Sequence, residues 1–125
     1  MGFKLGGRSQ SIANKGNINK SMPFRIVRRD LDPGINAEAE DGDTIVIDKD
    51  IPTGSKVFKK AVAHEAVHCQ EMRDGELAYG DDWVRDGKKT YARKDGMIKY
   101  NGKWHEEGSM VFPWEKRAKA AEKNA

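Results

Sequence analysis

Residues 61–72 read AVAHEAVHCQEM, and at their centre His64-Glu65-Ala66-Val67-His68 has the pattern H-E-x-x-H. Positions i and i+4 lie on one face of an α-helix, so both imidazoles can point at one metal ion. The glutamate directly after the first histidine can reach a water molecule on that ion and accept its proton. The stretch therefore predicts a helix that carries two zinc ligands, His64 and His68, and a catalytic base, Glu65.

The residues around this pattern predict where the helix begins and ends. The segment 52–54 (Pro-Thr-Gly) ends the preceding strand, and Ser55 is a suitable N-cap, as is Thr53 if the helix begins earlier. The helix should run over about residues 56–73, because Gly75 is a typical C-terminal stop.

This helix has two adjacent stripes, of which the apolar one is expected to be buried. One side carries both histidines and Glu65, together with Val57, Ala61 and Met72. The apolar stripe beside it should pack on a sheet, and it consists of Phe58, Val62, Ala66 and Cys69. The histidines should therefore lie at the border of the buried face, where a metal is shielded on one side and open to solvent on the other.

The rest of the chain predicts a small α+β domain in which this helix packs on a β-sheet. Alternating apolar residues predict a strand within 22–31, and the β-branched run 44–48 (TIVID) is the clearest strand. Between them, residues 38–43 are expected to form an acidic loop. Two Asp-Gly and one Asn-Gly turn dipeptides divide residues 83–106 into a meander of short strands. Pro113 then opens a short C-terminal helix that ends near residue 123.

Composition limits the whole chain. Its 125 residues are enough for one domain, and with 34% charged and 37% hydrophobic residues the core must be small. No stretch has the length and apolar character of a membrane span or a signal peptide. Cys69 is the single cysteine, so an internal disulfide is excluded and a reducing compartment is favoured.

The N-terminal segment differs from the rest in charge. Residues 1–29 hold seven Lys or Arg and no Asp or Glu. Residues 1–21 are rich in Gly, Ser, Asn, Gln and Lys and show no helical or strand periodicity. We interpret 1–21 as a flexible basic arm and 22–125 as the folded domain. The arm can be a solvated tail or can dock on an acidic protein partner, and nucleic acid is the less favoured partner.

A catalytic zinc site requires a third protein ligand and an open position for water. Asp74 follows His68 at the spacing of H-E-x-x-H-x-x-G-x-x-D, but Glu71 replaces the glycine that would break the helix. Glu115 is the better candidate, because a carboxylate on the second helix can approach from the opposite side. A first-turn glutamate is also stabilised by the helix dipole without any metal, so the sequence leaves this choice open. The reserve ligands are His105, Glu106 and Glu107.

Hydrolysis would also use a hydrogen-bond donor that stabilises the transition state. His105 is the first candidate for this role. Three tyrosines are alternatives, and each can equally be a packed aromatic residue: Tyr79, Tyr91 and Tyr100.

Two separated motifs together resemble a known family. AVAHEAVHCQEM, followed much later by PWEKRA, is similar to the gluzincin-type zincins. More narrowly, residues 47–56 (IDKDIPTGSK) and 113–116 (PWEK) resemble small phage- and prophage-encoded metallopeptidase-like proteins. The resemblance covers about residues 44–118. It implies a minimal zincin-like domain in which His64, His68 and Glu115 bind Zn²⁺ and Glu65 is the base.

These observations lead to the hypothesis of a zinc metallopeptidase that cleaves a peptide or protein, located in the host cytoplasm or in a phage virion. The strand 44–48 is expected to pair with an extended peptide substrate. The main alternative is a virion structural or scaffold protein that keeps zinc for stability, although a structural site has no need of Glu65 beside it. A nucleic-acid-binding protein that uses the basic arm ranks last.

Overall fold

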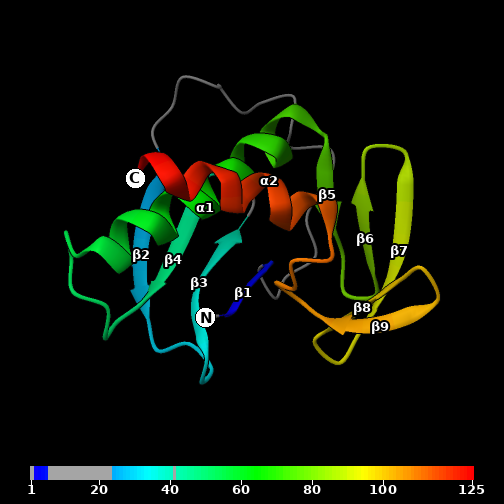
Figure 1. Ribbon diagram of the computed structural model, residues 1–125, viewed down its shortest axis with the longest axis horizontal. Coiled ribbons are helices and arrows are strands. Elements are labelled where there is room, and N and C mark those ends of the chain that lie inside the picture. Colours follow the sequence, from blue (N-terminus) through cyan, green and yellow to red (C-terminus); the bar gives the residue numbers. More distant parts are fainter. Residues whose placement is uncertain (1, 6–23, 41) are drawn as a thin grey trace.

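The computed structural model describes residues 2–5, 24–40 and 42–125, and it confirms the α+β class (Figure 1). A four-stranded sheet carries two stacked helices, and a five-stranded antiparallel sheet lies at one end. The strands of the first sheet are β1 (Gly2–Leu5), β2 (Arg25–Arg29), β3 (Ile35–Glu40) and β4 (Thr44–Asp48). Those of the second are β5 (Leu77–Tyr79), β6 (Trp83–Asp86), β7 (Lys89–Lys94), β8 (Met97–Tyr100) and β9 (Lys103–Glu106). The helices are α1 (Lys56–Asp74), α2 (Pro113–Ala121) and the 3₁₀ turn η2 (Glu122–Asn124).

Strand β4 is the centre of the first sheet, in which the strand order is β1-β3-β4-β2. It pairs antiparallel with β3 and parallel with β2, and Ile45, Val46 and Ile47 are fully buried. A continuous β-branched run suits a strand that is covered on both faces. The predicted strand is therefore confirmed at 44–48. The expectation that it pairs with a peptide substrate is wrong, because both of its edges are occupied by neighbouring strands.

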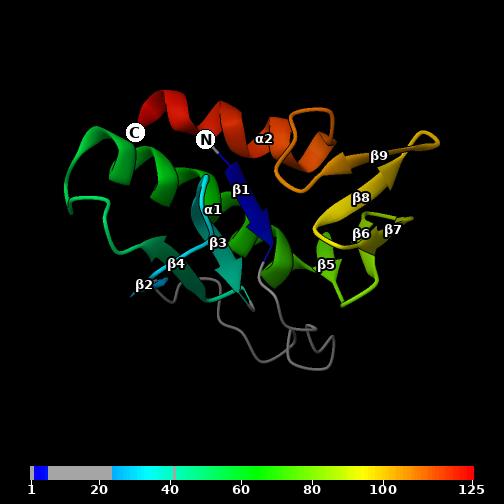
Figure 2. The same cartoon turned by 90° about the horizontal axis from the view of Figure 1, so that it is seen from below.

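Two predictions at the N-terminal side of this sheet also need correction. The proposed flexible arm includes residues 2–5, yet these residues form β1, which pairs in parallel with β3 (Figure 2). An edge strand of four residues, held by backbone hydrogen bonds, is too short to show the two-residue alternation of apolar and polar residues that identifies a strand in a sequence. The rest of the proposed arm, residue 1 and residues 6–21, lies outside the described residues. Strand β2 falls within the strand predicted at 22–31. Residues 38–40 belong to β3 rather than to a loop, because the buried alanines Ala37 and Ala39 face the core between acidic residues.

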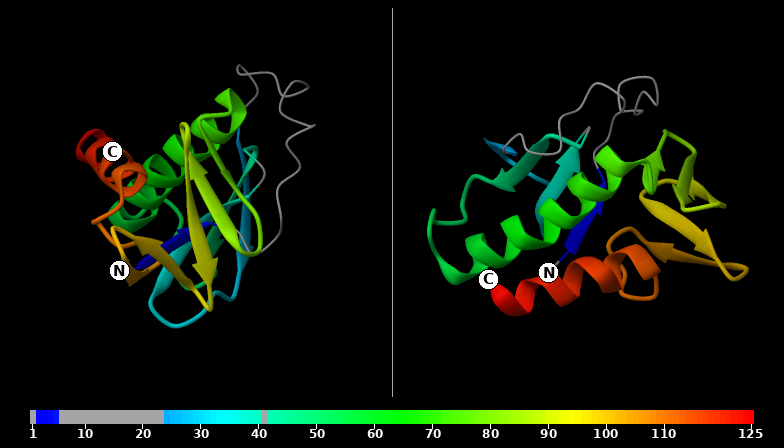
Figure 3. Two further views of the ribbon diagram at one scale, coloured as in Figure 1. Left: turned by 90° about the vertical axis from the view of Figure 1, so that its right-hand side faces the viewer. Right: turned by 90° about the horizontal axis from the view of Figure 1, so that it is seen from above.

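Helix α1 lies between the four-stranded sheet and α2 (Figure 3). The Ser55 hydroxyl accepts a hydrogen bond from the Phe58 backbone N–H at 3.1 Å, and Gly75 ends the helix with φ of +78°. Both termini were predicted, because the capping residues satisfy backbone groups that the helix leaves unpaired. The expected half-open position of the histidines is wrong. His64 and His68 are each only 1% exposed, because α2 covers the face that was expected to meet solvent.

The second sheet is the predicted meander with one additional strand, β5, which follows the Gly75 stop directly. Two of its hairpins turn at Asp95-Gly96 and Asn101-Gly102, where both residues of each pair have positive φ. This is the geometry of the type I′ turn that such dipeptides favour. The sheet leads the chain to Phe112, which stacks on Trp114 with ring centroids 4.7 Å apart, and both rings are fully buried. This pair fixes the start of α2.

Candidate metal centre

Three side chains from α1 and α2 converge at the interface of the two helices. The Glu115 Oε1 atom lies 2.7 Å from His64 Nε2 and 3.2 Å from His68 Nε2. One ligand atom from each of the three lies within 4.8 Å of the others, and all three residues are buried. The set can therefore hold a metal ion, and it is the set that the sequence predicted.

The position of Glu115 follows from the start of α2. Pro113 occupies the first turn, where its missing N–H breaks no hydrogen bond, and the Phe112–Trp114 stack anchors this turn in the core. The helix then runs antiparallel to α1, so that Glu115 is beside His68 and Glu122 is beside His64. A carboxylate in the first helical turn thus points across at two imidazoles one turn apart.

Each imidazole also has a carboxylate on its outer nitrogen. Glu122 Oε2 is 2.7 Å from His64 Nδ1, and Glu71 Oε1 is 3.6 Å from His68 Nδ1. Metal-binding histidines commonly donate their second ring N–H to a carboxylate, which fixes the tautomer and leaves the other nitrogen free for the metal. The Glu122 contact therefore leaves His64 Nε2 for the shared position at Glu115. For His68, the 3.6 Å between Nδ1 and Glu71 exceeds hydrogen-bond distance, and Nε2 faces Glu115 through its own 3.2 Å contact.

The outer carboxylates are themselves held by cations. Lys119 Nζ is 3.2 Å from Glu122 Oε1, and Arg117 Nε donates to Glu71 Oε2 at 2.6 Å. Sequence reasoning missed both glutamates, although helical spacing contains the signal. Glu122 follows Glu115 by two turns on the same face of the helical segment, and Glu71 follows His68 by three residues.

Glu65 is fully buried beside this group. Within the described part of the chain, neither of its carboxylate oxygens has a hydrogen-bond partner. Burial raises the pKa of Glu65 to about 8, against the opposing charges of His68 and His64. A buried carboxylate without a donor is unfavourable, so the arrangement calls for a proton or a polar ligand at this point.

The ionisation of the three candidate ligands is set by their mutual contacts. Burial lowers the pKa of His68, but the charge and hydrogen bond of Glu115 outweigh it and raise that pKa to about 10. For Glu115, burial raises the pKa, and the charge of His68 and the hydrogen bonds from both histidines lower it to about 2. In this site the Glu115 carboxylate is an anion that attracts positive charge, and protons and a divalent cation compete for the same place.

The donor set suits a divalent metal ion, and the distances can be compared with those of a tetrahedral zinc site. Ligand atoms about 2.0–2.2 Å from a tetrahedral ion are about 3.3 Å apart, close to the 3.2 Å between His68 Nε2 and Glu115 Oε1. The 2.7 Å contact of His64 requires a shift of a few tenths of an ångström. Two histidines and one carboxylate are the protein ligands of catalytic zinc sites that keep an open fourth position. Cys69, the thiol of the chain, instead faces the sheet, with Sγ 3.6 Å from the Thr44 carbonyl oxygen.

The reserve candidates do not join the group. Asp74 is exposed and accepts a hydrogen bond from Gln70, and Glu107 pairs with Arg93 at 2.7 Å. His105 lies on β9 with its ring edge-on to Phe112, at a centroid distance of 6.0 Å. Together with Glu106 and Glu107 it lines a cavity that none of the three converging residues lines. The role of His105 as a transition-state donor therefore stays a prediction without a contact that supports it.

The three tyrosines are packed aromatic residues. Tyr79 is fully buried with the Arg93 guanidinium 5.1 Å from its ring centroid, and Tyr91 contacts both Tyr100 and Trp114 at 5.5 Å. These contacts place the rings in the core that supports α2.

No protein-family model, curated protein or solved structure matches this chain. The resemblance to gluzincin-type zincins therefore remains a prediction that depends on the motif residues themselves. Among the described residues, neither helix combines the length and the apolar character that crossing a membrane requires.

Proposed function

We propose that this protein is a zinc-dependent peptidase in which Glu65 acts as the general base. The observation that carries the proposal is the buried Glu65 carboxylate, whose two oxygens have no hydrogen-bond partner among the described residues, beside the converging group His64, His68 and Glu115. A zinc site that serves only to join two helices needs no such carboxylate.

The residues of the chain divide the chemistry between them. His64, His68 and Glu115 would hold the ion, and zinc bound there supplies an acidic water and polarises the scissile carbonyl. Glu65 would accept the proton of the attacking water and deliver it to the amine of the departing fragment. Glu122 would keep the His64 imidazole in the tautomer that binds metal, and the Glu71 carboxylate would place a negative charge near the His68 ring.

A second function is supported by the burial of the site. The two histidines and Glu115 are each 1% exposed, and they connect α1 to α2 in a domain with a small core. Zinc in that place would stabilise the fold, as expected for a virion structural or scaffold protein that keeps the ion without catalysis.

The deciding experiment compares wild-type protein with Glu65→Gln and Glu115→Ala. Metal content is measured by elemental analysis, and hydrolysis of a mixed peptide library is followed by mass spectrometry, with and without a chelator. We expect one zinc per chain in wild type and in Glu65→Gln, reduced zinc in Glu115→Ala, and chelator-sensitive hydrolysis in wild type alone. Stoichiometric zinc without hydrolysis would favour the structural function. Hydrolysis that persists in Glu65→Gln would refute the assigned base.

A further inference from the structure

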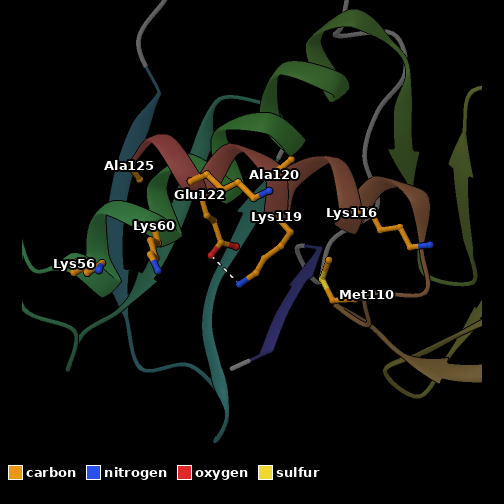
Figure 4. Close-up of a pocket in the computed structure, with 9 residues that line it drawn as sticks. Lys56, Lys60, Met110, Lys116, Lys119, Ala120, Glu122 and Ala125 are labelled. Carbon is orange, nitrogen blue, oxygen red and sulfur yellow. Dashed lines mark hydrogen bonds and ion pairs between the residues drawn. The ribbon is translucent and has the colours of Figure 1, made fainter.

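Two cavities adjoin one another along the outer side of α1 and α2. The larger has a volume of about 490 Å³ and lies between the first turns of α1 and the end of α2 (Figure 4). The smaller, of about 310 Å³, has His64 in its wall. The two cavities share four lining residues, which are Lys60, Met110, Lys119 and Glu122. They therefore form a continuous depression that leads from solvent to a candidate metal ligand.

The lining of this depression is strongly cationic. Five lysines line the larger cavity and one acidic side chain, Glu122, accompanies them: Lys56, Lys60, Lys116, Lys119 and Lys123. Figure 4 shows Lys56 and Lys60 projecting from α1, opposite Lys119 and Glu122. Lys119 pairs with Glu122, whereas the other four lysines form no ion pair with any described residue. Unpaired cations around a concave surface attract anionic ligands.

Glu122 connects this charged depression to the candidate metal centre. Its Oε1 contacts Lys119 at 3.2 Å, and its Oε2 lies 2.7 Å from His64 Nδ1. A ligand that occupies the smaller cavity thus lies directly against His64 and its carboxylate partner. Because His64 and Glu122 belong to both, the depression and the candidate metal centre adjoin one another.

We propose that this depression binds the acidic side chains of a peptide substrate, an assignment that depends on the proposed peptidase function. Apart from His64, the described residues of the walls include no aromatic ring on which nucleic-acid bases could stack. They provide exposed aliphatic surface at Met110 and Val57. Carboxylates in a peptide complement the lysines, and small side chains can lie on the aliphatic surface. The inferred substrate class is therefore peptides rich in Asp or Glu.

The test measures binding of two fluorescein-labelled octapeptides, one alternating Glu with Ala and the other alternating Gln with Ala. Anisotropy is recorded with zinc-loaded Glu65→Gln protein, in which the proposed base is absent. In the cavity variant, Lys60, Lys116 and Lys123 are replaced by Gln. The matched control replaces Lys89, Lys94 and Lys103, which are exposed on β7 and β9 and line neither cavity. Both triple variants lose the same net charge.

We expect the Glu peptide to bind at least tenfold more tightly than the Gln peptide, and the cavity variant to lose about tenfold while the control loses less than twofold. Equal losses in the two triple variants would overturn the proposal, because the attraction would then come from net charge alone. Tighter binding of a single-stranded oligonucleotide of equal charge, lost in the cavity variant, would also overturn it by assigning the depression to nucleic acid.

A hydrolysis arm separates this inference from the proposed function. Wild-type protein that cleaves both peptides with equal kcat/KM would be a peptidase without the inferred preference, so the inference alone would fail. Charge-selective binding that depends on the three cavity lysines, in a protein that cleaves neither peptide, would support the anion-binding depression and refute the proposed peptidase function.

Discussion

The Glu122 carboxylate offers the sharpest test of the metal centre, because it contacts a candidate ligand without being one. Its Oε2 lies 2.7 Å from His64 Nδ1, a short contact in which the imidazole N–H donates to an anion. The charged hydrogen bond contributes about 1.5–3 kcal/mol, against about 0.5–1.5 kcal/mol for a neutral one. Replacing Glu122 by Gln keeps an acceptor oxygen and removes the charge, so the difference of about 1.4 kcal/mol predicts a zinc Kd about tenfold weaker.

Truncation at the same position removes the acceptor as well. Glu122→Ala should weaken zinc binding by up to about 100-fold, because His64 then loses the partner that selects its tautomer. Glu71→Gln should have a smaller effect, below tenfold, since Glu71 Oε1 is 3.6 Å from His68 Nδ1. Zinc affinity is measured by competition with a chromophoric indicator, and near-ultraviolet circular dichroism verifies the fold of each variant. Glu76→Gln, at an exposed position, is the control. Wild-type affinity in a folded Glu122→Ala protein would falsify the coupling between these two residues.

Three further predictions concern pH and stability. Zinc affinity of the wild type should rise by at least about tenfold per pH unit between pH 6.5 and 9. His68, with a pKa of about 10 in the metal-free protein, must release a proton, and the pKa of His64 is raised as well. A flat profile in competition titrations would contradict this. The carboxyl of Glu65 ionises near pH 4.5 in the unfolded chain and near pH 8 in the folded one, so metal-free wild type loses stability as the pH rises through this window. Glu65→Gln has no such loss, and its free energy of unfolding relative to wild type should therefore grow by about 1.4 kcal/mol per pH unit between pH 4.5 and 8. Urea unfolding at several pH values measures this difference. Ile47→Ala, at a fully buried position of β4, should lower the free energy of unfolding by about 2–5 kcal/mol. Ile26→Ala, at a 43% exposed position, should lower it by much less. Equal losses in thermal unfolding would argue against β4 as the core strand.

The sequence predicted those elements that depend on local signals. Ser55 and Gly75 bracket α1 because they act on the helix ends directly, and the turn dipeptides at 95–96 and 101–102 carry the positive φ values that their hairpins require. The run 44–48 is recognisable because every residue suits a buried strand. In each of these cases the residue and the structure that it specifies are neighbours in the chain.

What the sequence did not predict depends on contacts between distant segments. β1 exists by pairing with β3, and the alanines of β3 are core residues only because α1 and the other strands enclose them. The full burial of His64 and His68 has the same origin, since it is α2 that closes over them. Glu115 could be proposed as a metal ligand because Pro113 marks the start of a helix and Glu115 places a carboxylate in its first turn. Its convergence with both imidazoles is a property of the α1–α2 interface.

The contacts around the candidate metal centre also explain how so short a helix is held in place. α2 has nine residues, fewer than an isolated helix needs for stability in water. Its position depends on the buried Phe112–Trp114 stack at one end and, along its length and into η2, on contacts of Glu115, Arg117 and Glu122 with α1. Because two of these three contacts go to His64, a cation bound there would strengthen the docking of α2, and the docking of α2 supplies the third ligand. Metal binding and the placement of α2 would therefore be a single coupled equilibrium, and the same helix forms one wall of the lysine-lined depression.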